Sequence, residues 1–198
     1  MILQRSFYER DTVEVAKDLL GKILVHESSQ GTTAGAIVET EAYRGPEDRA
    51  AHSYGGRRTG RNEVMFGQKG VAYVYFIYGM YYCINVTAGN APGKPEAVLI
   101  RALEPVEGQD IMAKRRGTAG NKAVNLANGP GRLCMAMDIS KVQNKTDLTA
   151  PPLYIKNAQP TNQECIVETT RIGVDYAGEW KNKPWRFYLK GNTFISAK

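Results

Sequence analysis

The sequence predicts a single compact α+β domain over residues 1–198, with a mixed, mostly antiparallel, open-barrel-like sheet flanked by helices. A chain of 198 residues suits one domain and is long enough to bury a substantial core. Its hydrophobic fraction of 42% and charged fraction of 23% are ordinary for a globular protein. Short segments of strand-forming residues, separated by turn residues, outnumber the helical patterns along the chain.

The first predicted element is a helix that begins near residue 11. Asp11 followed by Glu14 resembles a capping box, and Val15 and Leu19 then recur at helical spacing. Gly21 follows in the position that glycine favours after a helix.

Two strands and a long loop come next. Lys22–His26 is a short apolar strand, residues 28–31 form a hairpin turn, and Ala34–Glu41 is the returning strand. The stretch Ala42–Asn62 is polar, rich in glycine and basic at its end, so we expect an ordered loop with a short helix near Glu47–Ala51. Loops of this length are uncommon unless they have a function.

A protruding hairpin is predicted over Val71–Thr87, VAYVYFIYGMYYCINVT, which holds five of the eleven tyrosines. Its residues are strand formers, and Gly79 marks the turn because glycine adopts positive φ at no cost. This places Tyr78 and Met80 at an exposed tip and Asn85 deep between the strands. An exposed aromatic tip favours contact with a partner. The alternative is a core hairpin whose tyrosine hydroxyls reach solvent.

The rest of the chain is predicted to be mostly strand with two helices. Ala97–Leu103 is a strand that carries Arg101 in an otherwise apolar run. Val106–Arg116 and Pro130–Met137 are the predicted helices. The remaining strands are Leu153–Lys156, Ile166–Gly173, Trp185–Leu189 and Thr193–Ser196.

Charge and cysteine content exclude several classes of protein. A net charge of +6 and a pI near 9.2 favour a polyanionic partner, although a solvated basic surface has the same composition. The three scattered cysteines, Cys83, Cys134 and Cys165, argue against a disulfide framework or a structural zinc site. No P-loop, nucleophile elbow or HExxH motif is present, and we expect no metal and no cofactor. The chain has no membrane-span candidate and no signal peptide, so we expect a cytoplasmic protein.

Four polar side chains are candidates for chemistry. Glu39 and Glu41 point to the same face at the end of a strand beside the long loop, where a carboxylate can act on protons. His52 lies inside that loop, and a structural role is the usual alternative for a lone histidine. Arg101 on a buried strand needs a carboxylate partner, and Glu41 is a natural candidate.

Taken together, four stretches carry a resemblance: ETEAYRGPEDRAAHS, YVYFIYGMYYCINVT, VLIRALEPVEG and GVDYAGEWKNKPWRFYLKG. The chain resembles the alkyladenine (3-methyladenine) DNA glycosylase family, the type found in mammals and many bacteria. The resemblance runs from about Lys17 to Ser196. It implies a monofunctional glycosylase of base excision repair that flips damaged purines out of double-stranded DNA. Such an enzyme hydrolyses the N-glycosidic bond of 3-methyladenine, 7-methylguanine, hypoxanthine or ethenoadenine and leaves an abasic site.

The resemblance also implies roles for residues of the catalytic site. Glu41 matches the general base that activates the water, and Arg101 matches the arginine beside that carboxylate. Tyr43, His52 and Tyr75 match the residues that form the aromatic slot for the flipped base, where stacking is tolerant of base identity.

Further matches lie on the hairpin. Tyr78 matches the residue that enters the minor groove and fills the gap left by the extruded nucleotide. Met80 and Tyr81 are expected to press on neighbouring base pairs or sugars. Asn85 matches the gate that crowds the exocyclic amino group of guanine and so rejects the undamaged base.

The basic end of the long loop is expected to bind the DNA backbone. Arg57, Arg58 and Arg61 directly follow the slot residues, so they are candidates for phosphate contacts. The protein is expected to be a monomer, associated with the nucleoid in a bacterium. Two alternatives remain: a non-catalytic nucleic-acid-binding protein that uses the same hairpin and loop, and a glycosylase that also nicks DNA through a lysine Schiff base.

Overall fold

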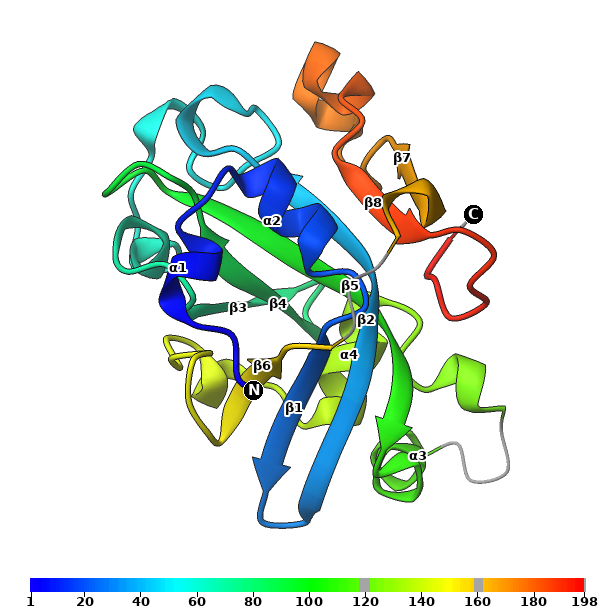
Figure 1. Cartoon of the computed structure of the whole chain (residues 1–198). Helices are drawn as coiled ribbons and strands as arrows, with labels where there is room; N and C mark the ends of the chain where they lie inside the picture. Colours follow the sequence, from blue (N-terminus) through cyan, green and yellow to red (C-terminus); the bar gives the residue numbers. More distant parts are fainter. Residues whose placement is uncertain (118–121, 159–161, 198) are drawn as a thin grey trace.

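The computed structural model describes residues 1–117, 122–158 and 162–197, and shows a curled antiparallel sheet with helices packed against it (Figure 1). The described strands pair in the order β3-β4-β5-β2-β1-β6, while β8 pairs with β2 and β7. The strands are β1 (Ile23–Ser28), β2 (Gly31–Tyr43), β3 (Ala72–Ile77), β4 (Tyr81–Ala88), β5 (Glu96–Glu107), β6 (Leu153–Lys156), β7 (Ile166–Thr169) and β8 (Arg186–Leu189). The α+β class predicted from the sequence is therefore confirmed.

Short helices connect and cover these strands. The α-helices are α1 (Arg5–Tyr8), α2 (Thr12–Asp18), α3 (Gln109–Arg116) and α4 (Pro130–Met137). The 3-10 helices are η1 (Gly45–Glu47), η2 (Tyr54–Gly56), η3 (Glu63–Phe66), η4 (Ala123–Asn125), η5 (Lys141–Gln143), η6 (Gln163–Cys165) and η7 (Asp175–Asn182). No helix of the described ranges is long and apolar enough to cross a membrane.

Strand β2 is the centre of the sheet. Its first half pairs with β1 and its second half with β8, while β5 runs along its other edge. The β2–β5 ladder is irregular between Ile37 and Thr40, and its register skips Arg101. Irregularities of this kind re-aim side chains near functional sites. In this protein the irregularity lies beside the buried side chain of Arg101 on β5.

The core lies within the curl of the sheet. Helix α2 packs on β2 and β5, and α4 packs on β4 and β5. Buried side chains of both helices, such as Val15, Leu19 and Leu133, join one apolar cluster with those of the strands. Asp11 caps α2 by accepting hydrogen bonds from the main-chain N–H groups of Val13 and Glu14, at 2.9 and 3.4 Å.

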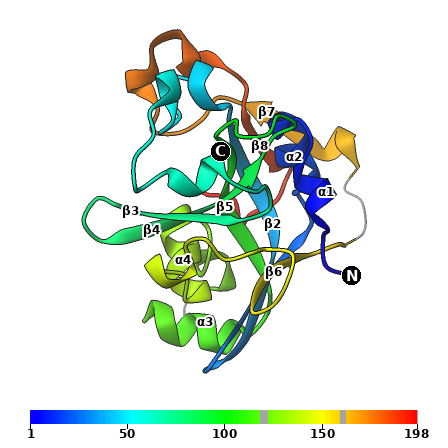
Figure 2. The ribbon, with the colours of Figure 1, turned by 90° about the vertical axis from the view of Figure 1, so that its left-hand side faces the viewer.

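Strands β3 and β4 form the hairpin, which projects from the body of the molecule (Figure 2). Ile77 pairs with Tyr81 at the last rung before the tip. Tyr78 is 80% exposed and Met80 is 63% exposed. Both Tyr78 and Gly79 have positive φ, 54° and 69°. The sequence predicted positive φ for Gly79 alone, so the left-handed conformation of Tyr78 was not predicted.

Several element boundaries differ from the sequence predictions. Strand β5 continues to Glu107, and helix α3 starts only after Gly108, whose φ of 69° ends the strand. A Cβ on Gly108 would lie 2.4 Å from the carbonyl oxygen of Thr32, so only glycine fits there. The helix expected over residues 47–51 is replaced by the short η1, and residues 193–196 form turns rather than a strand.

Candidate active site

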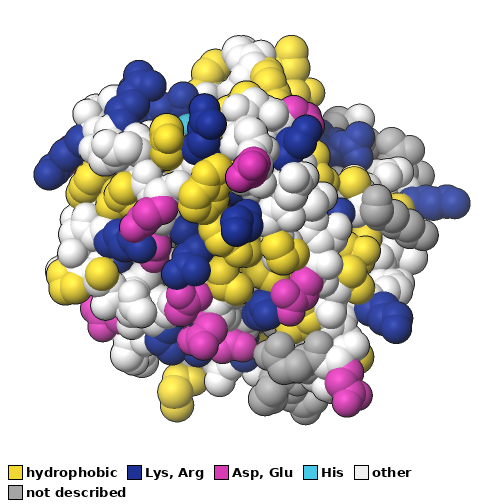
Figure 3. Space-filling view, turned by 90° about the horizontal axis from the view of Figure 1, so that it is seen from above, with side chains coloured by type: hydrophobic (Ala, Val, Ile, Leu, Met, Phe, Trp, Pro, Cys, Tyr) yellow, Lys and Arg dark blue, Asp and Glu magenta, His cyan; other side chains and the backbone are white. Residues whose placement is uncertain are grey.

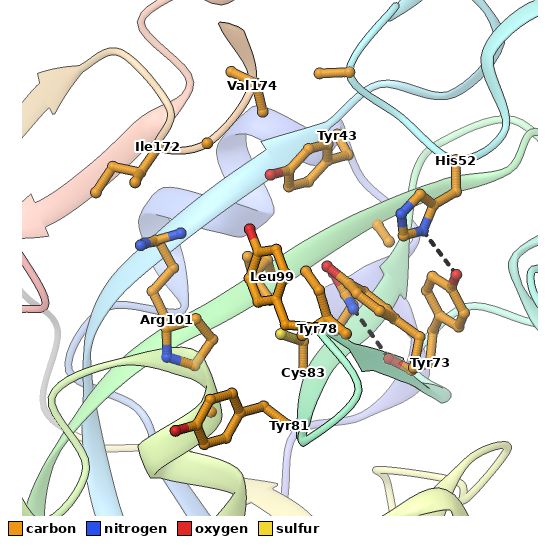
Figure 4. Close-up of a pocket in the computed structure, with 18 of the residues that line it drawn as sticks. Tyr43, His52, Tyr73, Tyr78, Tyr81, Cys83, Leu99, Arg101, Ile172 and Val174 are labelled. Carbon is orange, nitrogen blue, oxygen red and sulfur yellow. Dashed lines mark hydrogen bonds between the residues drawn. The ribbon is translucent and has the colours of Figure 1, made fainter. Parts of the chain in front are cut away.

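A cavity of about 380 Å³ opens between the hairpin, the β2–β5 ladder, the long loop and the segment after β7 (Figure 4). Most of the site residues named from the sequence line it, although they come from five separate segments. The lining includes Tyr43, His52, Tyr75, Tyr78, Tyr81, Asn85 and Arg101. Its volume lies at the lower end of the range for small-molecule sites.

Glu41 lies directly behind this lining and is fully buried. Its Oε2 accepts a hydrogen bond from the hydroxyl of Tyr43 at 2.8 Å. Its Oε1 accepts one from the main-chain N–H of Ile172 at 2.8 Å and lies 3.2 Å from Nη1 of Arg101. The three contacting residues all border the cavity, so the carboxylate lies at the cavity wall.

Arg101 bridges two buried carboxylates. Its Nε donates to Oε1 of Glu39 at 3.0 Å, while its Nη1 forms the ion pair with Glu41. Burial alone would lower the pKa of Arg101, but the charges of Glu41 and Glu39 outweigh it and raise that pKa. The guanidinium is therefore a fixed cation at the cavity. The ion pair that the sequence suggested between Arg101 and Glu41 is confirmed.

Aromatic rings form one side of the cavity. The rings of His52 and Tyr75 meet edge to face, with centroids 4.7 Å apart, and those of Tyr73 and Tyr75 are 5.3 Å apart. Nδ1 of His52 is hydrogen-bonded to the hydroxyl of Tyr73 at 2.8 Å, which fixes the imidazole. The guanidinium of Arg171 lies 4.8 Å from the ring centroid of Tyr43.

Several titratable side chains line the cavity beside the charged Arg101. Burial, together with the charges of Arg61 and Arg57, lowers the pKa of His52 to about 4, even though part of the residue is exposed to solvent. Burial raises the pKa of the Cys83 thiol to about 11 and that of Tyr75 well above its ordinary range. These groups therefore remain uncharged at neutral pH.

Asn85 lies at the bottom of the hairpin, directly opposite Tyr73. It is 3% exposed, and its Nδ2 donates to the carbonyl oxygen of Tyr73 at 3.1 Å. This contact fixes the orientation of the amide within the cavity lining.

Helix α4 packs against strand β4 of the hairpin. Pro130 and Gly131 line the cavity beside Tyr81. A Cβ on Gly131 would lie 2.9 Å from Cγ of Tyr81, so the helix can approach the tyrosine ring this closely only with glycine. This contact was not predicted from the sequence, because a glycine in the first turn of a helix has no pattern of its own.

The three loop arginines lie outside the main cavity. Arg57 and Arg61 line a second hollow of about 330 Å³ that shares His52 and Tyr176 with the first. Arg61 covers the ring of Tyr75 at 4.7 Å. Arg58 is paired with Glu63 through two hydrogen bonds, so its charge is already partly neutralised. Figure 3 shows Lys and Arg side chains interspersed with hydrophobic and acidic ones on this face of the molecule.

Some residues of the site were not identified from the sequence. Arg171 and Asp48 form a fully buried ion pair between the segment after β7 and the long loop. This ion pair fixes the position of the neighbouring Ile172, whose main-chain N–H donates a hydrogen bond to Glu41. The partners are 123 residues apart, and no local pattern connects them.

No group of three or more His, Cys, Asp or Glu side chains suited to a metal ion occurs in the part of the chain that the structure describes. Cys83 and Cys134 are buried free thiols, and Cys165 is an exposed one.

Comparisons with known proteins agree along the length of the chain. The family model for Methylpurine-DNA glycosylase matches residues 6–193. A protein of Clostridium acetobutylicum, named "Putative 3-methyladenine DNA glycosylase", is 53% identical over 202 residues, covering 99% of this chain and 98% of the relative. Proteins with the same name from Desulfitobacterium hafniense and Bacillus cereus are 49% and 51% identical. They cover 99% and 98% of this chain, and 98% of each relative.

Proposed function

Because the chain belongs to the methylpurine-DNA glycosylase family, we propose that it excises alkylated and deaminated purines from DNA with a water molecule activated by Glu41. Membership makes the protein a 3-methyladenine DNA glycosylase, which hydrolyses N-glycosidic bonds. The proposed substrates are 3-methyladenine, 7-methylguanine, hypoxanthine and ethenoadenine.

The observation that carries this proposal is the environment of Glu41. An ionised carboxylate offers about four acceptor positions. Within the described ranges, three are taken by Tyr43, Ile172 and Arg101, so Oε2 keeps a position for one further donor. A water molecule that donates to this position would lie beside the cavity that receives the base.

The proposed reaction is a single displacement by water. Glu41 accepts a proton from the water as the water oxygen bonds to C1′ of the sugar. The C1′–N9 bond breaks, and its electron pair leaves with the purine. A base made cationic by alkylation departs neutral, whereas a neutral base such as hypoxanthine takes up a proton as it leaves, which balances the proton that the water gives up. Positive charge develops on the sugar during this step, and the nearby carboxylate stabilises it. The products are the free base and an abasic site.

Arg101 compensates the buried charge of Glu41. Burying a charge is costly unless an opposite charge is close, and Nη1 of Arg101 is 3.2 Å from Glu41. Because neighbouring carboxylates raise the pKa of this guanidinium, it stays charged throughout the reaction.

The slot made by Tyr43, His52 and Tyr75 is proposed to hold the flipped base. Stacking of a base on an aromatic side chain is worth about 1–3 kcal/mol and is largely independent of base identity. A base made cationic by alkylation gains further attraction to electron-rich rings. Asn85, with its amide fixed by Tyr73, would crowd the exocyclic amino group of undamaged guanine.

The hairpin tip is proposed to occupy the space that the base leaves in the duplex. Tyr78 is exposed and projects from the body of the protein, as an intercalating side chain requires. Met80 and Tyr81 would contact the neighbouring base pairs or sugars, and Arg57, Arg58 and Arg61 would contact phosphates. A monomer suffices for all of these contacts.

The test is single-turnover excision from duplexes that contain one hypoxanthine or one 7-methylguanine. We expect strand breakage only after alkali, and a loss of about 1,000-fold in Glu41→Gln, within the range for removing a general base. Glu96→Gln is the matched control, because Glu96 is also a buried carboxylate on the sheet but its partners, Thr12 and Lys94, lie outside the cavity lining.

Two outcomes would contradict the proposal. Tight binding of both lesions without breakage would favour the non-catalytic nucleic-acid-binding alternative. Breakage before alkali, with a covalent DNA adduct trapped by borohydride, would favour the lyase alternative.

A further inference from the structure

Glu39 is a second buried carboxylate next to the site, two residues before Glu41 on β2. Its Oε1 accepts hydrogen bonds from Nε of Arg101 at 3.0 Å, from Nη1 of Arg186 at 2.9 Å and from the hydroxyl of Ser196 at 2.9 Å. Its Oε2 accepts one from the main-chain N–H of Ser196 at 2.6 Å.

These four donors enclose the carboxylate, three of them at Oε1 and one at Oε2. Of the described residues that contact the Glu39 carboxylate, only Arg101 lines the cavity, whereas all three partners of Glu41 do. Its position and contacts do not suit it to act on the substrate itself.

The segment after β8 completes this arrangement. The hydroxyl of Ser196 contacts both Glu39 and Nη2 of Arg101, at 2.9 and 3.1 Å. Arg186 on β8 is held by the carbonyl oxygens of Thr170 and Ala197 at 3.1 and 3.0 Å. Residues far apart in the sequence therefore fix Glu39 from several sides.

We propose that Glu39, held by Ser196 and Arg186, is a positioning residue that sets the orientation of Arg101 toward Glu41. Its contact with Nε anchors one edge of the guanidinium, so that a single nitrogen, Nη1, reaches Glu41. This leaves one acceptor position of Glu41 Oε2 for the proposed water. The inference rests on the proposed function and adds a residue to its machinery.

The physical reason is the preference of arginine for bidentate pairing with a carboxylate. Two carboxylates, Glu39 and Glu41, face two guanidinium groups, Arg101 and Arg186, so the buried charges balance. Without the charge of Glu39, the guanidinium of Arg101 would turn toward Glu41 as its remaining anionic partner. Two nitrogens would then occupy the carboxylate and exclude the water.

The test is Glu39→Gln in single-turnover excision of 7-methylguanine, with DNA affinity measured in parallel. We expect the rate constant to fall about 100-fold, the size of effect that misplacing a catalytic group produces. The Kd for lesion-containing DNA should stay within about threefold of the unmodified protein, because Glu39 touches no substrate. Glu96→Gln should leave the rate constant within about threefold, because it controls for the loss of a buried carboxylate.

A double-variant cycle separates positioning from general destabilisation. In an Arg101→Gln background the positioned group is gone, so adding Glu39→Gln should lower the rate by less than about threefold. If the effects of the two single substitutions multiply in the double variant, the inference is overturned. So would a Glu39→Gln rate equal to that of the unmodified protein.

Ser196 provides an independent test if Glu39→Gln does not fold. Ser196→Ala removes the hydroxyl shared by Glu39 and Arg101, and we expect about a tenfold slower excision, as for one lost hydrogen bond. Ser196→Thr keeps the hydroxyl and should restore the rate. Equal rates for the alanine variant and the unmodified protein would overturn the inference. An unmodified protein without excision activity would instead refute the proposed function.

Discussion

His52 shows how its surroundings decide the state of a single side chain. Burial, together with the charges of Arg61 and Arg57, favours the neutral form of its ring, which Tyr73 holds. A neutral imidazole can stack on a cationic base without repulsion. The histidine therefore suits a slot for alkylated purines.

We expect the His52 ring to titrate with a midpoint near pH 4 rather than at its ordinary value of 6.5. Between these values the unfolded chain binds more protons than the folded one, so the free energy of unfolding decreases as pH falls through this window. Ring chemical shifts followed by NMR against pH measure the midpoint. A midpoint at 6.5 or above would show that burial and the charges of Arg61 and Arg57 do not lower the pKa of the ring.

Asn85 is expected to set the discrimination against guanine. Asn85→Ser removes bulk from the bottom of the cavity, so excision of undamaged guanine should rise while excision of hypoxanthine changes by less than about tenfold. Release of each base from defined duplexes measures this. Unchanged release of guanine would show that Asn85 is not the gate that rejects this base.

At the residue scale, the sequence predicted the contacts that follow from local chemistry. A buried Arg101 needs a carboxylate, and Glu41 provides one. The alternation of side chains could not separate Glu39 from Glu41, because both point to one face of β2, and only the family resemblance favoured Glu41. What distinguishes them is Ser196, Arg186 and Ile172, and these contacts exist only in the folded molecule.

The hairpin is the element in which sequence and structure agree most closely. Alternating strand formers predicted both strands, and a central glycine predicted the turn. The positive φ of Tyr78 was not predicted, because a tyrosine in that conformation is unfavourable by about 1–2 kcal/mol. Such strain persists where the surrounding structure imposes it and is common at functional sites. Strand β5 was predicted too short, since Pro105 in its interior favours an end.

Replacing Tyr78 separates strain from function. Tyr78→Gly should be more stable than Tyr78→Ala by about 1 kcal/mol, because glycine adopts φ of 54° without a Cβ clash. Both variants should lose flipping of ethenoadenine, observed by its fluorescence. Equal stability in denaturant titrations would argue against strain at the tip. Retained flipping would argue against the proposed insertion of Tyr78 into the duplex.

At the scale of the whole molecule, a net charge of +6 is expected to make DNA binding depend on salt. The affinity should fall linearly on a log–log plot. Arg57→Gln should reduce the slope by about 1. Arg58→Gln should reduce it less, because Glu63 already neutralises part of that charge. Binding isotherms at several salt concentrations give the slopes, and equal effects of the two variants would contradict this difference.

The placement of β2 has a consequence for the timescales of motion in the molecule. Its main chain at Glu39–Glu41 has hydrogen-bonded strands on both sides, β5 and β8. Amide hydrogens there should exchange with solvent only when the sheet opens globally, whereas those at Tyr78–Met80 exchange by local opening. A slowly exchanging strand is thus joined to a rapidly exchanging hairpin tip. In the proposed function, the tip adapts to distorted DNA steps while Glu41, the carboxylate proposed to act on the sugar, keeps its place.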